Sequence, residues 1–257
     1  MLRAALSSSA LTAPPRAVIW IGFYGAVGFG WLALFWAVQG QAEPAPGFWA
    51  SLCIGAGEAR LGALWAMWGL MAAAMMLPTF APALATFLDL GHAGATRIRD
   101  AAALTGGYLG VWLGAALAGA VAQQALGSLG LLSEGGSLRG GFAAVLLLGA
   151  GLYQLSPAKA ACLAKCRMPL TFFMGRWRPG AAHAARMGAE LGVVCLGCCW
   201  ALMALGFVGG TMNLLWMGAA TLFMIFEKLP DIGRWLTRPS GWALIVAAGV
   251  QALVTAL

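Results

Sequence analysis

The sequence predicts an all-α protein, a polytopic membrane helical bundle of about seven transmembrane helices with its N-terminus in the cytoplasm. Hydrophobic residues make up 61% of the chain and charged residues only 9%, whereas a soluble domain carries about a quarter charged residues. The apolar runs are long enough for helices rather than for barrel strands. The net charge of +7 is explained by the topology described below, so it does not indicate binding to nucleic acid.

Seven apolar runs mark the predicted spans of a single transmembrane domain over residues 1–257. The first run has about 22 apolar residues, more than the core of a signal peptide, so we interpret it as an uncleaved anchor. The sixth and seventh runs are short. The spans are expected at residues 17–38, 61–88, 101–126, 140–157, 187–209, 213–227 and 240–257.

The positive charges set the orientation. With the N-terminus inside, 13 of the 15 Lys and Arg residues fall on inner segments, and only Arg60 and Arg139 fall outside. A wrong number of spans would scatter the charges, so this bias supports both the orientation and an odd number of spans. The sequence therefore predicts a multi-pass protein of the bacterial inner membrane.

The long segment 158–186 is predicted to be a cytoplasmic loop that begins with a short helix. Ser156 followed by Pro157 is typical of a helix N-cap and first helical position, and the helix is expected to end near Arg167. Its basic side chains, Lys159 among them, would suit the surface of an anionic inner leaflet.

Small residues form stripes on two predicted spans. Gly106, Gly110 and Gly114 recur every four residues in the third span, and Gly188 and Gly192 form a shorter stripe in the fifth. Such stripes let another helix approach closely. The longer stripe is a candidate surface for a membrane partner or for a homo-oligomer.

Methionines line the second span. Met67, Met71 and Met75 fall on one helix face, one per turn. Met76 points elsewhere and is a secondary candidate ligand. A methionine row is more often core or lipid-facing filler than a metal site. Pro78 cannot donate to the carbonyl of residue 74, so the helix is expected to kink or open there, and the freed carbonyl must be satisfied by a neighbouring helix or by a wet cavity.

The fifth span carries the strongest metal-site signal. Cys195, Cys198, Cys199 and Met203 share one side of a helix inside an apolar run. Thiol and thioether groups without oxygen ligands suit a soft ion such as Cu(I). If the second and fifth spans touch, the methionine row faces this cluster and the two form a ladder of sulfur ligands through the bilayer.

Other sulfur residues extend the candidate set. Cys162 and Cys166 share one face of the short cytoplasmic helix, as a metal pair, a redox pair or inert thiols. Met212 and Met217 flank the outer turn before the sixth span, and Cys53 is expected to be structural.

Two charge pairs are expected at the inner ends of the spans. Arg186 and Glu190 are four residues apart on one helix face. Glu227 and Lys228 are interpreted as an ion pair, with a capping or gating role left open.

These residues resemble a bacterial family described as predicted metal-binding integral membrane proteins. Members look like copper-handling accessories, and some are thought to act as membrane copper chaperones for copper oxidases such as tyrosinase-like enzymes. The resemblance covers most of residues 65–230. Its blocks are Met67 to Pro78, Tyr153 to Arg167, Gly197 to Met203, Met212-Asn213, Trp216-Met217 and Glu227-Lys228.

We therefore expect a non-catalytic Cu(I)-binding protein that holds, conducts or delivers copper to a copper enzyme or a periplasmic copper carrier. The sequence has no Walker loop or phosphorylation motif that would couple copper movement to ATP. Two alternatives stay open. A transmembrane thiol–disulfide relay would use the cysteines but not the methionines, and an accessory subunit of a larger membrane complex would use neither.

Overall fold

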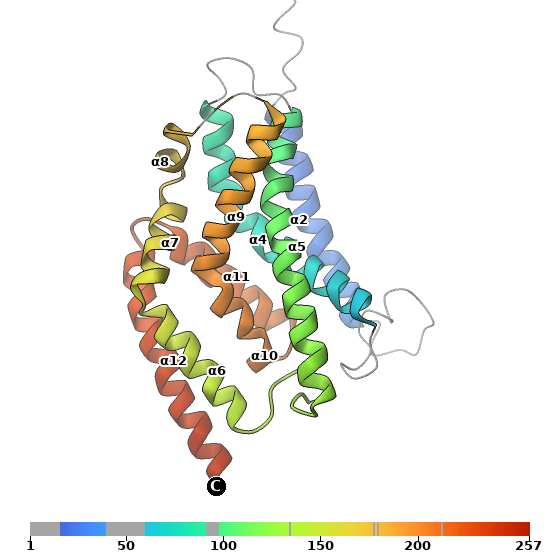
Figure 1. Ribbon diagram of the computed structural model, residues 1–257, viewed down its shortest axis with the longest axis vertical. Helices are drawn as coiled ribbons and strands as arrows, with labels where there is room; N and C mark the ends of the chain where they lie inside the picture. The colour runs from blue at the N-terminus through green and yellow to red at the C-terminus, as the bar shows by residue number, and fades with distance from the viewer. Residues whose placement is uncertain are drawn as a thin grey trace, which may run out of the picture.

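The computed structural model describes residues 16–39, 60–90 and 98–257, apart from residues 134, 177, 179 and 212. Over these residues the chain is all-α, as predicted, and the one β feature is an isolated bridge between Leu132 and Leu138 (Figure 1). The helices are α2 (Arg16–Gln39), α4 (Leu61–Leu90), α5 (Ile98–Ser128), α6 (Gly141–Gln154), α7 (Pro157–Arg167), α8 (Pro169–Met174), α9 (Ala181–Ala204), α10 (Gly206–Gly209), α11 (Leu214–Lys228) and α12 (Gly233–Ala256).

Five helices of the described residues are long and apolar enough to cross a membrane: α2, α4, α5, α9 continued through α10, and α12. The predicted fourth and sixth spans correspond to α6 and α11, which have 14 and 15 residues. At 1.5 Å per residue they are about 21 and 23 Å long, shorter than a hydrocarbon core of about 30 Å. A count of seven complete spans therefore stays a prediction.

The chain bends by 62° between α6 and α7. Pro157 has no backbone N–H with which to continue α6, so a new helix begins at this residue. Ser156 caps the new helix, because its Oγ accepts a hydrogen bond from the backbone N–H of Lys159 at 3.2 Å. The predicted N-cap and the predicted short helix are both confirmed.

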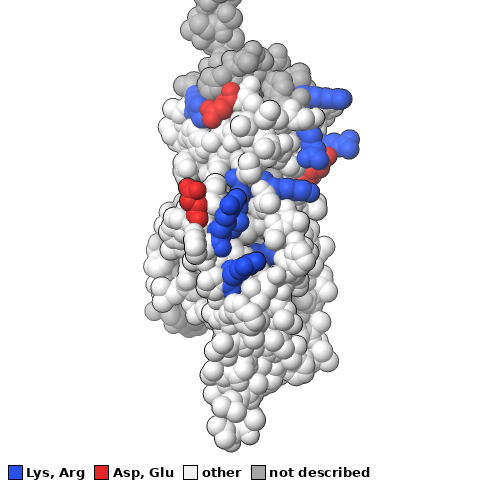
Figure 2. Space-filling view, turned by 90° about the vertical axis from the view of Figure 1, so that its left-hand side faces the viewer, with Lys and Arg blue, Asp and Glu red and all other residues white. Residues whose placement is uncertain are grey.

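Charged side chains are unevenly distributed over the molecule. On the face shown in Figure 2, Lys, Arg, Asp and Glu lie in the upper and middle parts, and the lower part is white. The C-terminal part of α12 extends to this lower end (Figure 1). On this face, the described residues at the lower end therefore show no charged side chain.

Glycines allow α5 and α9 to approach at backbone distance. A Cβ added at Gly188 would lie 1.9 Å from the Leu104 carbonyl oxygen, and one at Gly107 would lie 1.9 Å from the Ala185 carbonyl oxygen. The predicted close approach at Gly188 is thus confirmed. By contrast, a Cβ at any position of the stripe Gly106, Gly110 and Gly114 meets nothing within 4 Å. That stripe faces away from the chain.

The carbonyl freed by proline in α4 has a partner on α2. Pro78 leaves the carbonyl of Ala74 without its helical donor, and the indole N–H of Trp31 donates to this oxygen at 3.1 Å. Gly30 beside it permits the approach, since a Cβ there would lie 3.3 Å from the Ala74 Cβ. The expected compensation by a neighbouring helix is therefore confirmed.

We predict that Gly188→Ala destabilises the fold. The added methyl would meet the Leu104 carbonyl oxygen, so α5 and α9 must separate, and such overpacking costs about 1–3 kcal/mol. Thermal unfolding in detergent, followed by circular dichroism, should show a lower midpoint. Gly110→Ala adds the same methyl in open space and should not lower the midpoint. Equal losses from both changes would contradict the described helix packing.

Candidate metal centre

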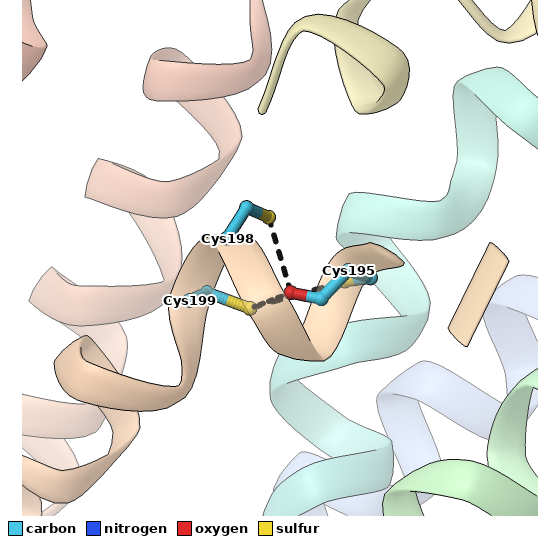
Figure 3. A group of neighbouring side chains, drawn as sticks. All are labelled: Cys195, Cys198 and Cys199. Atoms are coloured by element: carbon cyan, nitrogen blue, oxygen red, sulfur yellow. Dashed lines mark hydrogen bonds between the residues drawn. The ribbon is translucent and has the colours of Figure 1, made fainter. Parts of the chain in front are cut away.

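Three cysteines of α9 form the centre of the candidate site. The Sγ atoms of Cys195, Cys198 and Cys199 lie within 4.8 Å of one another, and each residue is 1% exposed. Their spacing of three and four residues places them on one helix face. The thiols of Cys198 and Cys199 donate to the Cys195 carbonyl at 3.1 and 2.9 Å (Figure 3). The cluster is a compact, buried group of thiols.

Two further sulfur atoms reach this cluster from other helices. On α7, the Sγ of Cys166 lies 3.7 Å from the Sγ of Cys198. On α4, the Sδ of Met76 lies 3.8 Å from the Sγ of Cys199. Within α9, the Sγ atoms of Cys195 and Cys199 are 3.8 Å apart. Five sulfur atoms from three helices therefore gather in one place, and we call this group the sulfur cluster.

The spacing within the sulfur cluster suits a soft metal ion. A metal–thiolate bond is about 2.3 Å long, so two sulfurs on one ion lie about 3.8–4.0 Å apart in tetrahedral or trigonal coordination. The three sulfur–sulfur contacts of the cluster lie at 3.7, 3.8 and 3.8 Å. Thiolate and thioether ligands favour Cu(I) over ions that prefer oxygen. The three thiols of α9 form a group that could hold such an ion.

The sulfur of Cys195 also faces polar groups. The Lys228 ammonium donates to Cys195 Sγ at 3.1 Å and to Thr79 Oγ1 at 2.8 Å. The Tyr108 hydroxyl lies 3.0 Å from the same sulfur and donates to the Met76 carbonyl at 3.3 Å. A positive charge so close to sulfur in a low-dielectric interior stabilises negative charge there. This sulfur is therefore the best placed to act as a thiolate.

No pattern in the sequence marks these polar groups as neighbours of Cys195. Lys228 carries one usable signal, because an ionisable residue at the end of an apolar span is a functional candidate by default. Thr79 and Tyr108 follow no pattern that separates them from ordinary span residues. Their place near Cys195 and Lys228 follows from the packing of α4 against α5 and α11, and of α5 against α9.

The methionine that contacts the cysteines lies beside the predicted row. Met67, Met71 and Met75 are all buried in the core, but the α4 sulfur that meets the cluster belongs to Met76. The reason is helix placement. Most of the packing surface of α9 is with α5, and α4 meets the cluster along the face that carries Met76 and Thr79, three residues apart.

The remaining sulfur candidates are distributed differently. Met203 lines an apolar cavity together with Trp68, near the C-terminal end of α9. Met217 is buried within α11. Met212 and Cys53 lie outside the described residues.

The helix predicted to lie at the membrane surface is partly buried in the protein instead. Lys159 of α7 is 1% exposed, and its ammonium donates to Glu227 Oε2 at 2.9 Å and to Gln154 Oε1 at 2.5 Å. These oxygens replace the water that the ammonium loses. Cys162 also points inward, since a Cβ added at Gly197 of α9 would lie 2.7 Å from its Sγ. This packing brings the second cysteine of α7 to the sulfur cluster.

The adjacent Glu227 and Lys228 do not form the expected ion pair with each other. Consecutive residues of a helix point about 100° apart, so Glu227 reaches Lys159 while Lys228 reaches the sulfur cluster. The expected pair of Arg186 and Glu190 is present, with Nε and Oε1 3.2 Å apart.

A buried group of soft ligands within an apolar helical bundle defines a protein able to hold a soft metal ion. Residues 65–251 match the family model described as PpoB2: copper chaperone. Because the match covers more than half of the chain, the protein belongs to this copper chaperone family, which confirms the resemblance seen in the sequence. No curated protein and no solved structure matches the chain.

We predict that Glu227→Gln destabilises the protein strongly. It leaves the buried Lys159 ammonium without its carboxylate, and breaking one side of a buried ion pair costs about 3–5 kcal/mol. Denaturant unfolding in detergent measures this loss. Glu190→Gln removes exposed pairs with Arg186 and Arg176 and should cost about 0–1 kcal/mol. Similar values for the two variants would show that the buried pair is not formed.

Proposed function

We propose that this protein binds Cu(I) at the sulfur cluster and passes it to a partner copper enzyme or to a periplasmic copper carrier. The observation that carries the proposal is the meeting of five sulfur atoms from α4, α7 and α9, with contacts of 3.7–3.8 Å. Membership of a copper chaperone family supports copper as the metal.

Charge balance supports a monovalent ion. Cu(I) held by two thiolates carries a net charge of −1, and the Lys228 ammonium beside Cys195 brings the assembly to zero. The Met76 thioether adds a ligand but no charge. A neutral assembly is far less costly in an apolar interior than a bare cation. Because the thioether bond is the weaker one, it offers a place where the metal can be released.

The surface supports a place in the membrane. Val246, Val250 and Leu253 on α12 are 65%, 58% and 66% exposed, and exposing apolar surface to water costs about 25 cal/mol per Å². Together with the five long apolar helices and the bias of Lys and Arg to one side of the predicted topology, this supports a multi-pass protein of the bacterial inner membrane. We propose a cytoplasmic N-terminus and seven spans.

One thiol pair favours an alternative function, a thiol–disulfide relay. Cys166 and Cys198 lie 3.7 Å apart across α7 and α9, near enough for a disulfide after a small movement. Against it stands Met76, whose thioether takes no part in disulfide exchange yet contacts the Cys199 sulfur. The two functions therefore differ in their dependence on Met76.

We predict one Cu(I) per chain for the purified protein in detergent under reducing conditions. The double change Cys195→Ser and Cys199→Ser should abolish binding, because it removes two thiol ligands of the cluster, including the Cys195 sulfur beside Lys228. Met76→Leu keeps the volume but removes one ligand, and should weaken affinity about tenfold, or 1.4 kcal/mol. Competition with a chromophoric Cu(I) chelator measures both effects.

Met71→Leu is the matched control for this experiment, because Met71 is equally buried in the same helix but belongs to the predicted row. Its affinity should equal that of the unchanged protein. A larger loss with Met71→Leu than with Met76→Leu would move the site to the row. Thiol-dependent electron transfer that survives Met76→Leu, without bound copper, would establish the relay instead.

We also predict that Lys228→Gln weakens Cu(I) binding. The amide keeps a hydrogen-bond donor but removes the positive charge that offsets the anionic copper–thiolate group, and a loss of about 10–100-fold is expected from such a supporting residue. The same chelator competition measures it. Lys165→Gln removes an exposed charge from α7 and should leave affinity unchanged. An unchanged affinity in Lys228→Gln would refute the charge-balance argument.

A further inference from the structure

A cavity of about 220 Å³ opens beside the sulfur cluster. Its wall contains the thiols of Cys166 and Cys195 together with the cationic groups of Arg167 and Lys228. Among the described residues that line it there is no Asp or Glu. The cavity thus combines soft ligands with a positively charged wall to which the described residues contribute no carboxylate.

We propose that this cavity receives Cu(I) from a small anionic thiol carrier, a carboxylate-bearing thiol that holds the ion through sulfur. The inference rests on the proposed copper function and names the source of the metal. At about 30 Å³ per water molecule the cavity has room for roughly seven waters. It can therefore admit the thiolate end of a small carrier but not a folded carrier protein.

Transfer in this cavity is a ligand exchange without a redox step. The Cys166 sulfur forms a bond to copper as the bond to the first carrier sulfur breaks, and the thiol proton of Cys166 passes to the departing thiolate. A second exchange at Cys195 releases the second carrier thiol in the same way. Copper remains Cu(I) throughout, and the net charge of −1 on the bis-thiolate complex is unchanged.

The positive wall selects the carrier by charge. Arg167 is held beside the cavity, because its Nε donates to the Glu227 carbonyl at 3.0 Å and its Nη2 to Thr237 Oγ1 at 3.2 Å. A fixed charge at the mouth of a low-dielectric cleft concentrates ions of the opposite sign and raises their association rate by 10-fold to 1,000-fold. Carboxylates on the carrier supply that opposite sign.

The test compares two copper donors with the detergent-solubilised full chain. Cu(I)–glutathione is anionic, and Cu(I)–cysteamine carries ammonium groups on an equally simple thiol. Copper acquired by the protein is measured at set times after rapid gel filtration. We expect the unchanged protein to load faster from glutathione. Arg167→Gln should slow loading from glutathione about tenfold without slowing loading from cysteamine.

Three controls separate the outcomes. Arg167→Lys retains the charge and should retain the preference for glutathione as the copper donor. Arg139→Gln removes an exposed charge that does not line the cavity and should change neither loading rate. Added salt should reduce the preference for glutathione. Equal rates from both donors, or equal slowing of both in Arg167→Gln, would overturn the carrier proposal while the final Cu(I) stoichiometry stays at one. Absence of Cu(I) binding from either donor would instead overturn the proposed function.

Discussion

The carboxylate of Glu227 ties together the helices that complete the sulfur cluster. It accepts from the buried Lys159 of α7 and from the Gln154 amide of α6, so three helices converge on one group. The next residue of α11 is Lys228, which faces the cluster, and α7 carries Cys166 two turns after Lys159. A buried ion pair is costly unless both partners stay in place. The Glu227 carboxylate therefore holds α7 and α11 in position, and with them the Cys166 thiol and the Lys228 ammonium.

The site contains two kinds of groups, soft sulfur ligands and the polar groups that surround one of them. Sulfur atoms supply the bonds that a soft ion prefers, while Lys228, Thr79 and Tyr108 surround one sulfur with hydrogen bonds and charge. The Cys195 carbonyl accepts both other thiols of α9, which orients their sulfur atoms before any metal arrives. Because these sulfur atoms are already oriented, the protein needs little rearrangement when it binds a metal ion.

Local signals in the sequence predict much of this arrangement. Rules that act within a few residues are enough to predict three features: the cysteine spacing within α9, the Ser156 cap of α7, and the need of the Ala74 carbonyl for a partner other than Pro78. What the sequence could not supply is the rotation of one helix against another. A shift of 100° decides whether Met75 or Met76 faces α9, and no pattern in α4 records that choice.

The positions of two buried lysines could not be predicted from the sequence for the same reason. Lys159 and Lys228 both follow apolar runs and read as topology markers, yet each is directed into the protein by a partner more than thirty residues away. Pairing between residues so far apart in the chain depends on how all the helices pack, and it produces no periodic pattern in the sequence.

Trp31 has a consequence for the evolution of the chain. Its indole N–H serves the Ala74 carbonyl that Pro78 leaves unpaired, yet α2 precedes the residues 65–251 that match the family model. In a variant with another residue at position 78, the backbone N–H of that residue could donate to the Ala74 carbonyl. The hydrogen bond from Trp31 would then no longer be needed. Trp31 and Pro78 should therefore be retained or replaced together among related sequences, which would link a segment outside the shared region to the missing backbone hydrogen bond of α4 near the sulfur cluster.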